Sequence, residues 1–184
     1  DTRAVEQAKL IDNIAPDAPD ASGAHGATSG LAKLIYLQQQ HHALANNSHL
    51  LHQADWINFN LGGPLGVSDE NNALKTGYDP ISRRWPQWID RLTDSNRLPM
   101  VVPPGTVIGN LSDKLCSIFK LSYSPRIIAG TTDSIAALLA TGASKVGDAV
   151  TSLGSTLVVK LISDVPIFLP IQGVYSHRLG DKWL

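Results

Sequence analysis

The chain has 184 residues, of which 43% are hydrophobic and 17% are charged, so we expect a packed core and not a disordered chain. The formal net charge of −1 gives no electrostatic reason to expect nucleic acid or an anionic membrane as a partner, and no apolar run approaches the roughly 20 residues that span a bilayer. The single cysteine, Cys116, excludes an intramolecular disulfide framework and indicates a reducing compartment.

The first half of the sequence predicts helices. Hydrophobic residues recur at helical spacing in three segments, which cover residues 5–11, 29–45 and 48–61. In the third helix, Ala54, Ile57 and Leu61 are expected to face the core. Gly62, followed by Gly63 and a proline, ends that helix.

Three shorter features of the first half are assigned structural roles. Asp69 is expected to cap a short helix. Trp85 and Trp88, next to the start of another helix, are interpreted as packing residues and not as a platform for stacking a sugar ring. Residues 112–119 predict an amphipathic helix in which Cys116 is buried as a small hydrophobic side chain.

Four histidines lie close together in the sequence, at His41, His42, His49 and His52. They fall on polar faces of the predicted helices without carboxylates at the spacing of metal ligands. We therefore expect them on the solvated surface, and the sequence predicts no metal site made of protein side chains.

The second half of the sequence mixes strands with a helix. Residues 126–129 predict a short buried strand that ends at a Gly-Thr-Thr-Asp turn, and the following helix should bury Ile135, Leu138 and Leu139. Two β-rich runs, 149–153 and 156–162, then predict a hairpin. The last residues, 173–184, predict a strand, a Gly-Asp turn and a second strand of two residues. From this incomplete hairpin we expect the chain to be a piece of a longer protein. The overall pattern is α/β, with a change of composition near residues 142–147.

Asp133, in the turn after the predicted strand, is the first candidate for chemistry. A carboxylate at the end of a strand is held rigidly at the edge where ligands of open α/β sheets bind, as a general base requires. Gly130 permits the tight turn, and Thr131 and Thr132 place hydroxyl groups beside it. The alternative is that Asp133 only caps the following helix.

The second candidate is the Thr-Ser-Leu-Gly-Ser-Thr run at residues 151–156. A glycine followed by hydroxyl residues can offer backbone N–H and side-chain O–H groups to phosphate oxygens. The alternative is a hairpin turn that needs small residues for steric reasons. The run is not a Walker-type loop, because no Gly-Lys-Ser or Gly-Lys-Thr follows it.

Together, these two motifs resemble the interdomain junction of the FGGY carbohydrate kinase family. The resemblance rests on Gly-Thr-Thr-Asp-Ser at residues 130–134 and on Gly-Asp-Ala-Val-Thr-Ser-Leu-Gly-Ser-Thr at residues 147–156. Further family landmarks occur in the same order at residues 54–56, 68–73, 103–109 and 173–177. Within the family, the sequence is most similar to the plant and cyanobacterial xylulose-kinase-like branch, which phosphorylates D-ribulose.

The resemblance implies a fold and a set of roles. The fold would be part of the actin-like, ribonuclease-H-like ATPase fold, with residues 1–143 ending the N-terminal, sugar-binding domain and residues 144–184 beginning the C-terminal, nucleotide-binding domain. Asp133 would be the catalytic base and would contact the sugar together with Ser134. The nucleotide-binding residues would be Thr132, Gly154, Ser155 and Thr156.

The activity implied is ATP-dependent phosphorylation of a pentulose, either D-ribulose or D-xylulose, with ATP and Mg²⁺ as cofactors and a small sugar as the substrate. Neither nucleic acid nor a membrane is expected as a partner. The compartment implied is the cytoplasm, or the chloroplast in a plant or alga. The family's N-terminal phosphate loop and adenine-binding segments are absent from these 184 residues, so the chain alone is expected to be inactive. The alternative from another functional class is a non-catalytic sugar-binding or regulatory relative of the kinase fold.

Overall fold

The structure is a computed structural model, which describes residues 2–14, 23–41, 48–154, 157–169, 172 and 174–184. Two of the predicted nucleotide-binding residues, Ser155 and Thr156, lie outside the described residues. Among the described residues, no helix is long and apolar enough to cross a membrane.

The N-terminal helices contribute most of a hydrophobic core. Helices α1 (Val5–Ile14) and α2 (Gly30–Gln40) pack against each other, and Ser29 caps α2 by accepting a hydrogen bond from the backbone N–H of Ala32 at 3.0 Å. The core consists of small and aliphatic side chains: Ala4, Ala8, Ile11, Ala24, Leu31, Ala32, Leu34, Ile35, Ile89 and Leu98. Trp85 and Trp88 pack on this core, which confirms their predicted role as packing residues.

Helix α3 (Gln53–Leu61) differs from its prediction in where it begins and in which face it buries. It begins after His52, and its buried residue is Asp55, whereas Ile57 is 51% exposed. Asp55 Oδ2 accepts a hydrogen bond from the backbone N–H of His52 at 2.9 Å and lies 2.8 Å from His52 Nδ1. Polar capping, and not an apolar stripe, therefore fixes the start of α3.

The same contacts correct the prediction for His52. Its Nδ1 also lies 3.0 Å from Ser68 Oγ, and its Nε2 lies 3.0 Å from Thr76 Oγ1. His52 is therefore largely buried, and its ring connects the start of α3 to Ser68 and Thr76. His41 and His49 are exposed as expected. His42 lies outside the described residues.

Two short parallel strands, β1 (Val67–Asp69) and β2 (Met100–Val102), lie at the centre of the molecule. Asp69 ends β1 and caps α4 (Glu70–Leu74) by accepting from two backbone N–H groups, as predicted. Between α4 and β2, two 3₁₀ helices span Gln87–Arg91 and Ser95–Arg97.

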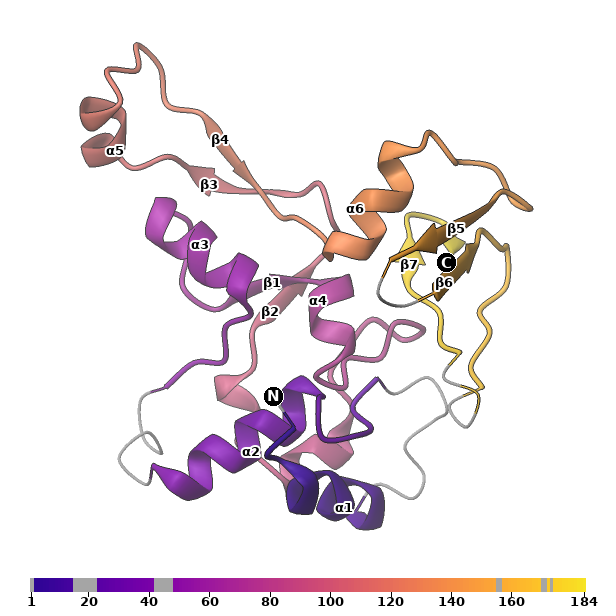
Figure 1. The fold of residues 1–184 in the computed structure, drawn as a ribbon. Helices are drawn as coiled ribbons and strands as arrows, with labels where there is room; N and C mark the ends of the chain where they lie inside the picture. Colours follow the sequence, from indigo (N-terminus) through magenta and orange to yellow (C-terminus); the bar gives the residue numbers. More distant parts are fainter. Residues whose placement is uncertain (1, 15–22, 42–47, 155–156, 170–171, 173) are drawn as a thin grey trace.

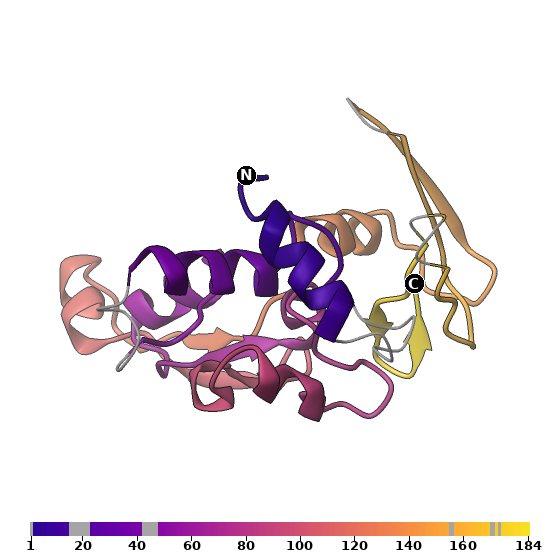
Figure 2. The same ribbon diagram turned by 90° about the horizontal axis from the view of Figure 1, so that it is seen from below.

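An arm extends from one end of the molecule (Figures 1 and 2). It consists of antiparallel strands β3 (Val107–Asn110) and β4 (Arg126–Ile128) with α5 (Asp113–Ile118) between them. The prediction of a buried strand here is only partly right, because Ile127 is buried while Ile128 is 42% exposed. The prediction of a buried Cys116 is wrong, since α5 has no buried residue.

The C-terminal elements lie at the opposite end from the arm, with α6 (Asp133–Ala140) between them and the centre (Figure 1). As predicted, β5 (Ala149–Leu153) and β6 (Leu157–Leu161) form an antiparallel pair, and this pair projects away from the body in Figure 2. A second antiparallel pair joins β7 (Arg178–Leu179) to β8 (Lys182–Trp183). In α6, Ile135 and Leu138 are buried as expected, but Leu139 is 49% exposed.

Candidate active site

Backbone hydrogen bonds to a neighbouring loop fix the turn that carries Asp133. The N–H of Ala129 donates to the carbonyl of Thr106, and the N–H of Gly105 donates to the carbonyl of Ala129, each at 2.8 Å. Gly130 follows this pair, and Thr132 then precedes the first residue of α6. The chain therefore leaves β4 and enters α6 through a turn anchored just before its glycine.

Asp133 is the first residue of α6, and its side chain is exposed. The residue at the cap position is Thr132, whose side chain makes no capping hydrogen bond. Asp133 Oδ1 accepts a hydrogen bond from the N–H of Ser134 at 2.7 Å, which orients the carboxylate at the helix N-terminus. Its second oxygen has no protein hydrogen bond assigned among the described residues, so this oxygen is available to a ligand.

A pocket of about 620 Å³ opens in front of Asp133. The pocket is lined by Asp133 and Ser134, by β6 (Leu157–Leu161) and by C-terminal residues that include Ser176 and His177. Its volume lies within the range of small-molecule sites. Thr132 does not line it, although its hydroxyl lies 3.4 Å from Ser134 Oγ.

Two lysines bring positive charge to this pocket. Lys160, on β6, and Lys75, which caps the C-terminus of α4, both line it with Asp133. Lys160 Nζ is buried and has no hydrogen-bond partner among the described residues. Burial lowers the pKa of Lys160, the Asp133 charge partly reverses that effect, and Lys75 adds to the lowering.

His177, one of the C-terminal residues that line the pocket, is held in its neutral form. Burial, with smaller contributions from Lys160 and Lys75, lowers its pKa to about 4. Its Nδ1 is buried and unpartnered within the described part of the chain. With His177 neutral at pH 7, the charged side chains lining the pocket are two ammonium groups and one carboxylate, so positive charges outnumber negative ones among these side chains.

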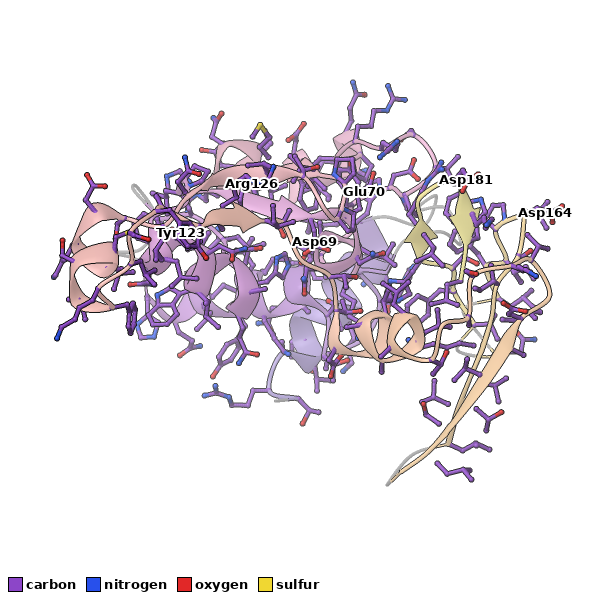
Figure 3. All side chains as sticks on the ribbon, turned by 90° about the horizontal axis from the view of Figure 1, so that it is seen from above. Asp69, Glu70, Tyr123, Arg126, Asp164 and Asp181 are labelled. Carbon is purple, nitrogen blue, oxygen red and sulfur yellow. The ribbon has the colours of Figure 1, made fainter. Side chains whose placement is uncertain are left out.

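A second layer of polar residues supports the Asp133 turn from α4. Asn71, which is 1% exposed, donates from Nδ2 to Thr131 Oγ1 in this turn at 3.0 Å. The preceding residue, Glu70, accepts a hydrogen bond from Arg83 Nε. Asn71 and Thr131 line a separate pocket of about 230 Å³. Figure 3 shows Asp69 and Glu70 near the centre of the molecule and Asp164 and Asp181 on the side of the C-terminal strands.

The second predicted motif is only partly described. Gly154 is exposed at the end of β5 and is not among the residues that line the Asp133 pocket. Beyond the motif, the residues that line this pocket begin at Leu157, on β6. Among the described residues, no three histidine, cysteine, aspartate or glutamate side chains are grouped as metal ligands would be.

Sequence reasoning missed Lys75, Lys160 and His177. A usable signal existed for Lys160, because it is the one charged residue in the run Leu-Val-Val-Lys-Leu-Ile at residues 157–162. A lysine inside an apolar strand is unusual enough to suggest a function. His177 lies in the family landmark at residues 173–177, to which no site role was assigned, and nothing local distinguishes Lys75.

No protein-family model matches the chain, but solved structures of sugar kinases do. A xyloylose kinase from Brucella ovis superimposes with a TM-score of 0.87 at 22% identity, over 100% of this chain and 39% of the kinase. A xylulose kinase from Rhodospirillum rubrum gives 0.84 at 22% identity, over 98% and 38%. A carbohydrate kinase from Novosphingobium aromaticivorans gives 0.73 at 25% identity, over 90% and 37%.

The chain thus spans about two fifths of the length of the solved structures that it matches. Its own coverage in these matches is nearly complete, so the likeness extends from the N-terminal helices to the C-terminal strands. The 184 residues have part of the actin-like, ribonuclease-H-like fold of the sugar kinases.

Proposed function

We propose that this chain belongs to an ATP-dependent FGGY carbohydrate kinase that phosphorylates a pentulose, with Asp133 as the general base. The observation that carries the proposal is the exposed Asp133 carboxylate, on an anchored turn, facing a pocket with excess positive charge. Phosphoryl transfer depends on positioning and charge neutralisation, and a pocket of this kind can supply both. The fold shared with sugar kinases supports the same reaction.

In the proposed reaction, a hydroxyl oxygen of the sugar attacks the γ-phosphorus of ATP. The bond from that phosphorus to the β–γ bridging oxygen breaks, ADP leaves, and the hydroxyl proton passes to the Asp133 carboxylate. The carboxylate oxygen that does not bind the Ser134 N–H is free to accept this proton. Ser134 lines the pocket beside Asp133 and is assigned to the sugar.

The remaining roles follow from the family resemblance. Thr132, Gly154, Ser155 and Thr156 are assigned to the nucleotide phosphates, and the excess positive charge of the pocket fits a phosphate-bearing substrate. Mg²⁺, which binds largely through substrate phosphates and water, would neutralise charge on the nucleotide. Residues 1–143 are assigned to the sugar-binding domain and 144–184 to the nucleotide-binding domain.

The substrate is tested with the complete protein, meaning these 184 residues with any that precede or follow them. ADP release is measured with a panel of ketoses and polyols. We expect the highest kcat/KM with D-ribulose, followed by D-xylulose, in line with the branch that the sequence resembles. A folded complete protein that binds these sugars but releases no ADP with any of them would instead support a non-catalytic sugar-binding relative.

A further inference from the structure

We propose that Lys160 is a phosphoryl-binding residue whose ammonium group binds the transferring phosphate in the pocket that Asp133 also lines. The inference rests on the proposed kinase function and adds a residue that lies outside the motifs from which that function was derived. Lys160 follows the Gly-Ser-Thr motif and lies on β6, whereas Asp133 begins α6. The fold brings the two residues to one pocket.

The first argument is the state of the Lys160 ammonium group. Its Nζ is shielded from solvent and has no hydrogen-bond partner among the described residues. A buried charge without a partner is costly, because the group loses its hydration and gains nothing in return. Of the described lysines, Lys9 and Lys182 show the usual alternative, since each donates from Nζ to an oxygen at 2.9 and 2.8 Å respectively.

The second argument is the charge around Lys160. Asp133 is the only carboxylate side chain that lines the pocket among the described residues, and Lys75 and Lys160 face it. Asp133 therefore cannot neutralise both ammonium groups. An anion that enters the pocket removes the repulsion between the lysines and completes the charge balance, so the pocket favours a negatively charged ligand.

The third argument concerns the chemistry of the ligand. A lysine ammonium is a compact point charge that binds phosphate oxygens well. In the transition state of the proposed reaction, the transferred phosphoryl group carries negative charge on its peripheral oxygens. The ammonium group of Lys160, in the same pocket as Asp133, stabilises that negative charge without repelling the sugar hydroxyl.

The ligand contact is tested with inorganic phosphate and with ADP as probes on the complete protein. His177 lines the same pocket and senses the Lys160 charge, so its ring signals in NMR spectra report occupancy without any need for turnover. We expect phosphate to shift these signals. In the Lys160→Met variant, phosphate and ADP affinity should fall about 10- to 100-fold, the value of a hydrogen bond to a charged group.

Methionine is a suitable replacement because it fills the same apolar strand position without the charge. Removing an unpartnered buried charge should leave the melting temperature unchanged or raise it, so lost binding would not reflect unfolding. Lys160→Arg keeps the charge and should recover part of the affinity. Lys114→Met, the same change at an exposed position on α5, is the control and should leave binding unchanged.

The outcomes separate this inference from the proposed function. If the complete protein phosphorylates a sugar while Lys160→Met keeps wild-type phosphate affinity and kcat, the role of Lys160 is refuted and the kinase assignment stands. If no sugar is phosphorylated but phosphate still binds through Lys160, the kinase assignment fails and the anion site stands. A fall in kcat together with weaker phosphate binding in Lys160→Met supports both.

Discussion

His177 shows how the cationic pocket affects a single residue. The ring is 8% exposed, lies beside Tyr175 at a centroid distance of 5.3 Å, and senses the charges of Lys160 and Lys75. Protonation would add a third positive charge to the pocket, and burial resists it. At neutral pH the uncharged ring therefore adds no third positive charge beside the two lysines.

This residue predicts a pH dependence of stability. The pKa of His177 is about 4 in the folded chain and 6.5 as its ordinary value, so between these pH values the unfolded state binds the extra proton. The contribution of neutral His177 to the free energy of unfolding should therefore be fully present above about pH 6.5. It should be lost as the pH drops toward 4, by about 3 kcal/mol in total. Urea unfolding at pH 7 and pH 4.5 measures this loss.

The control for this prediction is His177→Phe, which keeps an aromatic ring without a titrating group. The variant should lose less stability than the wild type over the same pH interval. An equal loss in both proteins would show that His177 does not cause the acid sensitivity.

At the scale of elements, helix α3 depends on one buried carboxylate. Asp55, whose side chain is 2% exposed, accepts from the backbone of His52 and holds the His52 ring, which in turn contacts Ser68 and Thr76. This network connects α3 to β1 and to the end of α4. Its loss should affect the packing of three elements.

Asp55→Ala should therefore reduce the free energy of unfolding by about 2–3 kcal/mol, because a helix cap is lost and a buried imidazole loses its partner. The matched control is Asp12→Ala, which removes an exposed contact to His25 at 3.0 Å and should cost at most about 1 kcal/mol. Chemical denaturation of both variants gives the comparison, and equal losses would contradict a special role for Asp55.

The predictability of the elements follows from what stabilises each one. Helices α1, α2 and α6 were predictable because apolar residues such as Ile11, Leu31 and Ile135 repeat at helical spacing and are buried. The start and buried face of α3 were not, because polar contacts made by His52 and Asp55 determine them. Strands β1 and β2, of three residues each, are too short to give a periodic signal.

The candidate site, like the elements, was predictable only in part. The Asp133 turn could be found because a glycine, hydroxyl residues and a carboxylate are contiguous in the sequence. Lys75 and His177 could not be assigned to the site, because they lie 102 positions apart in the sequence and only the tertiary fold places both on the pocket.

At the scale of the whole molecule, the 184 residues match about two fifths of each sugar kinase structure. The proposed reaction needs a sugar site and a complete nucleotide site, and the resemblance to the FGGY kinases implies that the phosphate loop and adenine-binding segments lie outside these residues. We therefore expect the 184 residues alone to release no ADP above background with D-ribulose. A steady-state coupled assay on the purified chain tests this, and measurable turnover would contradict it.

The measurement that tests the central claim most directly is kcat of Asp133→Asn in the complete protein, with Asp113→Asn as its control. Both aspartates are acidic residues in the first turn of a helix, and asparagine can still accept from the Ser134 N–H. The account predicts that Asp133→Asn lowers kcat by about 10²- to 10⁴-fold with an unchanged melting temperature, while Asp113→Asn keeps full activity. Wild-type kcat in Asp133→Asn would contradict the assignment of Asp133 as the base.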